Sequence, residues 1–90
     1  MLQIKEGYIL RPFLEKWVAV YVGEGEERPP MFTMNKTGAF LWERLQSLTT
    51  REHLLQAMLD RYEVTEELAE QQLAQFLSKL KEKGILEEIS

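Results

Sequence analysis

The chain contains no cysteine and a single histidine among its 90 residues. Without cysteine it can form neither disulfides nor thiolate metal sites. His53 has no second imidazole with which to hold a transition metal, and a general base needs a partner within hydrogen-bond reach. Ser47, Ser78 and Ser90 lack the strand-turn-helix surroundings of a nucleophilic serine. We therefore expect a protein that is not an enzyme, with no catalytic residue, no metal and no cofactor.

Long apolar runs and an excess of positive charge are also missing. No apolar stretch approaches the roughly 20 residues that cross a bilayer, and the first residues lack the basic start of a secretion signal. These absences predict a cytoplasmic protein that does not engage a membrane. The 15 acidic side chains outnumber the 11 basic ones, for a net charge of −4. Nucleic-acid binders are expected to be basic, so nucleic acid is not the expected partner.

The residues that are present are typical of a globular chain, and the length predicts one domain over residues 1–90. Apolar and β-branched residues favour strands over residues 8–13, 16–22 and 31–34. Pro29 and Pro30, which cannot donate ladder hydrogen bonds, suit the start of an edge strand. Alternation within the third strand sends either Met31 and Thr33 or Phe32 and Met34 toward the core, and the sequence leaves this choice open.

The rest of the chain shows the apolar spacing of three helices. Asn35 and Thr37 are both suitable caps for the first, Thr49 begins a capping box before the second, and Thr65 caps the third. The stripe of the first helix comprises Gly38, Leu41, Trp42, Leu45 and Leu48, and that of the third Ala69, Leu73, Phe76, Leu77 and Leu80. Gly84 ends the third helix, and Ile85, Leu86 and Ile89 are expected to pack back onto the core. The predicted fold is α+β and winged helix-turn-helix-like, a three-stranded antiparallel sheet followed by three helices.

The junction between the third strand and the first helix, residues 32–42, carries the most specific pattern: an apolar strand, Asn-x-Thr-Gly, then apolar residues and Trp42. It resembles the PqqD-like family, the recognition elements for ribosomally made, post-translationally modified peptides. Residues 7–11 and 17–22 are similar to that family's first two strands, and the similarity extends over about residues 5–88. The chain departs from the family at Gln72, where many members carry an acidic residue.

The resemblance implies a module that binds a peptide and does not catalyse. Members of the family capture the leader region of a precursor peptide as a strand added to their third strand, and its side chains enter the groove beside the third helix. A separate peptide-modifying enzyme, often a radical S-adenosylmethionine protein, then acts on the peptide. The predicted peptide-binding residues are Met31, Phe32, Thr33, Met34, Leu68, Gln72, Gln75 and Lys79.

Two other functions are compatible with the same elements. A winged-helix DNA-binding regulator would need basic residues along its recognition helix, yet the second and third helices are rich in Glu and Asp. A structural or dimerising accessory subunit of an enzyme is the other alternative, because an exposed edge strand also permits a homodimer.

Overall fold

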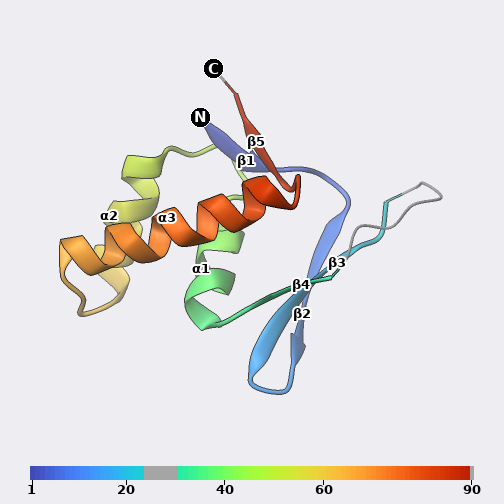
Figure 1. Cartoon of the computed structure of the whole chain (residues 1–90), viewed down its shortest axis with the longest axis horizontal. Helices are drawn as coiled ribbons and strands as arrows, with labels where there is room; N and C mark the ends of the chain where they lie inside the picture. The colour runs from blue at the N-terminus through green and yellow to red at the C-terminus, as the bar shows by residue number, and fades with distance from the viewer. Residues whose placement is uncertain (24–30, 90) are drawn as a thin grey trace.

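The chain folds as a small antiparallel sheet followed by three helices (Figure 1). The computed structural model describes residues 1–23 and 31–89. Strands β2 (Tyr8–Phe13), β3 (Lys16–Tyr21) and β4 (Phe32–Met34) form the sheet in the order β2-β3-β4, with both neighbouring pairs antiparallel. Helices α1 (Lys36–Arg44), α2 (Arg51–Arg61) and α3 (Glu66–Glu82) follow. This arrangement confirms the predicted α+β fold, while Pro29 and Pro30 lie outside the described residues.

A second, two-stranded sheet was not predicted. Strand β1 (Leu2–Ile4) pairs antiparallel with β5 (Leu86–Glu88), which brings the two ends of the chain side by side (Figure 1). Three residues are too few for alternation to be visible in the sequence. The pairing also joins segments more than eighty residues apart, so its stability depends on the rest of the fold already being in place.

The helices begin where side chains accept otherwise unpaired N–H groups. Asn35 Oδ1 accepts from the Gly38 N–H at 2.9 Å, and Thr65 Oγ1 accepts from the Leu68 N–H at 3.2 Å. The predicted cap at Thr49 is wrong by one residue, because Thr50 caps α2. The backbone of Thr49 instead exchanges two hydrogen bonds with Leu2, at 2.7 and 3.0 Å, and this delays the start of the helix.

The ends of the helices differ from the prediction in two places. Helix α1 ends at Arg44, so Leu48 lies beyond it and is 47% exposed instead of extending the buried stripe. After α3, Gly84 takes a left-handed backbone with φ of 74°, which favours glycine and turns the chain back. Ile85 is then fully buried as expected, whereas Ile89 stays exposed because it follows the last residue of β5.

A chain of aromatic rings connects the sheet to the helices. Trp42 of α1, 1% exposed, packs edge-on against Tyr8 at a centroid distance of 5.9 Å and stacks with Phe32 at 6.5 Å. Phe32 in turn meets Phe76 of α3 edge-on at 6.1 Å. Burial, and then the neighbouring phenol of Tyr21, raise the pKa of Tyr8. The core therefore lies between the sheet and all three helices, with Leu54 and Met58 contributed by α2, while the β2–β3 hairpin extends away from the helices (Figure 1).

Candidate functional site

One contact at the open end of the β2–β3 hairpin, away from its turn, shows which residue pairs of the sheet are hydrogen-bonded. The Val22 N–H donates to the Gly7 carbonyl at 2.6 Å, so this pair is hydrogen-bonded. In an antiparallel ladder, hydrogen-bonded and non-hydrogen-bonded pairs alternate. The pairs that Val20, Val18 and Lys16 make with β2 are therefore hydrogen-bonded. The backbone groups of these three residues consequently point toward β2 and away from β4.

The same alternation determines which edge of β4 is open. Trp17 and Ala19 direct their backbone groups toward β4, where they lie opposite Met34 and Phe32. Thr33 lies between these two residues in a non-hydrogen-bonded pair, so its N–H and carbonyl point away from β3. No further strand follows β4 in the sheet within the described residues. Thr33 is exposed and presents one unpaired donor and one unpaired acceptor to an incoming strand.

The opposite edge of the sheet, formed by β2, is less receptive. Pro12 lies opposite Trp17 in a non-hydrogen-bonded pair, so its nitrogen faces outward. A proline nitrogen carries no hydrogen, and proline at such a position protects an edge strand from further pairing. The two edges are therefore unequal, because Pro12 interrupts the row of outward N–H groups on β2 that Tyr8 and Leu10 would otherwise continue.

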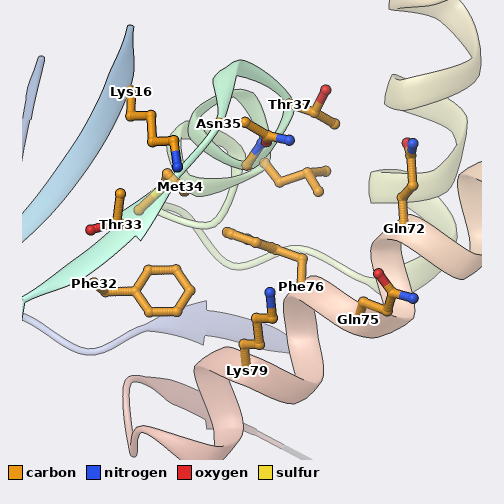
Figure 2. Close-up of a pocket in the computed structure, with 12 residues that line it drawn as sticks. Lys16, Phe32, Thr33, Met34, Asn35, Thr37, Gln72, Gln75, Phe76 and Lys79 are labelled. Atoms are coloured by element: carbon orange, nitrogen blue, oxygen red, sulfur yellow. The ribbon is translucent and has the colours of Figure 1, made fainter. Parts of the chain in front are cut away.

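A groove of about 410 Å³ lies beside the open edge, between β4 and α3 (Figure 2). Its floor is apolar and nearly closed to solvent, formed by Phe32, Met34 and Phe76. The choice left open by the sequence is thus settled: Phe32 and Met34 face the helices. Gln72, Gln75 and Lys79 of α3 form the facing wall.

Two of the predicted site residues lie apart from this groove. Met31 precedes β4 and is 68% exposed; it lines a second, apolar hollow of about 890 Å³ on the other face of the sheet, with Val18 and Val20. Leu68 is in the first turn of α3 and does not line the groove. It lies one turn before Gln72, beyond the part of the helix that faces the short strand β4.

The described residues offer few other groups that could bind a metal ion or catalyse a reaction. No group of three or more His, Cys, Asp or Glu residues lies close enough together there to hold a metal ion. The His53 side chain is exposed on α2. None of the three helices combines the length and the apolar character that a membrane span requires.

The family model described as Coenzyme PQQ synthesis protein D (PqqD) matches residues 16–86, from the start of β3 to the first residue of β5. The match covers the open edge, the groove and all three helices. This chain belongs to the PqqD family. The resemblance drawn from residues 32–42 is thereby confirmed.

Two solved structures resemble this PqqD-family chain over nearly its whole length. One is TbiB1 in complex with the TbiA(beta) leader peptide, with a TM-score of 0.74, 22% identity and coverage of 98% of both chains. The other is lasso peptide synthetase B1 complexed with the leader peptide, with a TM-score of 0.70, 22% identity and coverage of 97% of this chain and 98% of that one. At such identity the likeness establishes the shared fold. A comparison with curated proteins finds no match.

The groove of the PqqD-family chain contains residues that the sequence alone did not single out. Lys16 lines it from the first position of β3, Asn35 and Thr37 line it at the start of α1, and Phe76 belongs to its floor. Phe76 had been assigned only to the core, and Asn35 and Thr37 only to the helix cap. No sequence pattern marked Lys16 as a groove residue, because its place in the groove follows from the pairing of β3 with β4.

Gly38 allows α1 to approach the groove floor closely. A Cβ at this position would lie 2.8 Å from Met34 Cβ and 3.2 Å from Phe76 Cε1, closer than side chains normally pack. Gly38→Ala gains about 1 kcal/mol of helix propensity, but overpacking costs about 1–3 kcal/mol. We expect net destabilisation of about 1 kcal/mol, lowering the Tm by several degrees in thermal unfolding.

The control for this substitution is Ser78→Ala on the exposed face of α3, where the change removes a hydroxyl and adds no atom that could clash. It is expected to raise stability by a few tenths of a kcal/mol. A Gly38→Ala variant as stable as the control would show that α1 and β4 can separate without cost.

Proposed function

We propose that this PqqD-family chain binds the leader segment of a ribosomal precursor peptide as a strand added to β4, and presents the peptide to a separate modifying enzyme. The observation that carries the proposal is the outward-facing N–H and carbonyl of Thr33 directly beside the groove. Strand addition of this kind obtains affinity from main-chain hydrogen bonds and specificity from pockets for alternate side chains. Both similar structures are described as complexes with a leader peptide, which supports the same use here.

The position of the groove indicates how the peptide is read. Because alternate residues of a strand point to opposite faces, every second peptide side chain enters the groove over Phe32 and Met34. Gln72, Gln75 and Lys79 then supply hydrogen bonds and a charge. A peptide that continues toward the first turn of α3 reaches Leu68. The intervening side chains lie on the outer face, near Met31.

In this proposal the chain contributes binding alone, over residues 1–90 as one domain, and the chemistry belongs to the partner. A radical S-adenosylmethionine protein is the class of peptide-modifying enzyme that the family resemblance suggests. A DNA-binding role is not favoured, because Glu66, Glu67 and Glu70 line the exposed side of α3 and would repel phosphates.

A dimerising accessory subunit has one observation in its favour. Phe13, Leu14 and Met31 are large apolar residues exposed around the hollow on the outer face of the sheet. Exposed apolar patches commonly mark interaction surfaces. A size measurement of the chain, with and without the modifying enzyme, separates a homodimer or enzyme subunit from a monomeric peptide carrier.

The proposal is tested by an NMR titration with synthetic peptides that cover the first half of each short reading frame found next to the gene for this chain. We expect amide shifts to cluster on residues 31–34 and 68–79, because the added strand pairs with β4 and its side chains contact α3. The control is the same peptide with its residue order scrambled, which should leave the chemical shifts of these amides unchanged. Shifts confined to α2 or to the β2 edge would place the site elsewhere and contradict strand addition.

A further inference from the structure

The charge of the groove is opposite to that of the chain. The whole protein carries −4, yet the charged residues that line the groove are Lys16 and Lys79, and none of the described lining residues is Asp or Glu. The groove is thus a local cationic site on an acidic protein. A field of this kind attracts ligands of negative charge and disfavours those of positive charge.

The two lysines come from elements on opposite sides of the groove. Lys16 begins β3, next to Trp17, which is paired with Met34, and Lys79 lies near the end of α3. Figure 2 shows both side chains directed into the groove, Lys16 beside Met34 and Lys79 from α3 into the space between Phe32 and Phe76. Among the described residues, the ion pair that forms joins Lys81 to Glu88 at 3.4 Å, so neither groove lysine is engaged by a carboxylate there.

We infer that the groove selects peptides with an acidic side chain at the inward-facing position between Lys16 and Lys79. This inference rests on the proposed function. A peptide strand on β4 covers the groove, which removes water from the lysines and strengthens their attraction to a carboxylate. Lys16 and Lys79 then donate charge-assisted hydrogen bonds to that carboxylate, and the Gln72 and Gln75 amides add neutral ones. The neighbouring inward-facing side chains of the peptide contact Phe32 and Phe76, so apolar residues are favoured at those peptide positions.

A selection from random linear peptides displayed on phage tests this preference without knowledge of the natural leader. The peptides should be long enough to cover a strand of about six residues. On the wild-type chain we expect enriched sequences to share one Asp or Glu flanked at alternate positions by apolar residues. On the K16E/K79E variant the shared position should become Lys or Arg. The K5E/K36E variant makes the same change in net charge at exposed lysines outside the groove, and should select the wild-type sequences.

Fluorescence anisotropy and NMR on the best selected peptide separate the two proposals. We expect K16E/K79E to weaken that peptide about tenfold or more, and a Glu→Lys peptide to recover affinity for the variant. Shifts at residues 31–34 and 72–79 with no acidic preference, or with K16E/K79E binding unchanged, overturn the inference and leave strand addition standing. Shifts away from β4 and α3, or a selection that yields no binding peptide, count against both.

Discussion

Thr33→Pro is expected to weaken binding of the leader peptide strongly while the chain remains folded. The Thr33 N–H points away from β3, so proline removes a donor that the sheet itself does not use. Its ring also occupies the space that a strand added at about 4.8 Å needs. A lost hydrogen bond that leaves its buried partner unsatisfied costs about 1–3 kcal/mol, which corresponds to a loss of affinity on the order of 10- to 100-fold. Isothermal titration with the leader peptide measures the loss.

Two controls make this substitution informative. Thr33→Ala changes the same exposed side chain and keeps the N–H, so it should bind nearly as well as the wild type. Circular dichroism and thermal unfolding of Thr33→Pro should show native helix content and a Tm lowered by only a few degrees. Wild-type affinity in a folded Thr33→Pro chain would exclude the edge of β4 as the place where the peptide adds.

Trp42→Ala is expected to cause the largest loss of stability among single substitutions in the core. Trp42 is 1% exposed and touches both Tyr8 of β2 and Phe32 of β4. Truncating a buried tryptophan to alanine costs about 3–5 kcal/mol, a large part of the roughly 5–15 kcal/mol that stabilises a domain. We therefore expect the Tm to fall by roughly 20 °C, and the urea midpoint to fall with it.

Trp17→Ala is the matched control, because the chain has two tryptophans and Trp17 is only partly buried. Its removal should cost clearly less than that of Trp42. The loss of Trp42 also frees one side of the Phe32 ring, so the variant should bind peptide more weakly even at a temperature where it is folded. Equal costs for the two tryptophans would contradict the central place of Trp42 in the core.

Much of the fold could be predicted because the signals are local. The runs of apolar and β-branched residues in β2 and β3, and the helical stripes of α1 and α3, are properties of short windows. The caps at Asn35 and Thr65 follow from the side chains themselves. The errors arose where a distant segment competes for the backbone. Thr49 pairs with Leu2 instead of beginning α2, and β5 exists because β1 is beside it.

The features of the candidate site also separate into those set by local sequence and those set by contacts between distant segments. By itself, the sequence determined the order of elements and the family resemblance at residues 32–42. It also showed that the chain has no cysteine and only one histidine. All three follow from residue types and their spacing. The tertiary structure alone decided that Phe32 and Met34 form the groove floor and that Leu68 lies outside it. It also placed Lys16 opposite Lys79. These facts depend on the register between β3 and β4 and on where α3 crosses the strand, and packing between distant segments sets both.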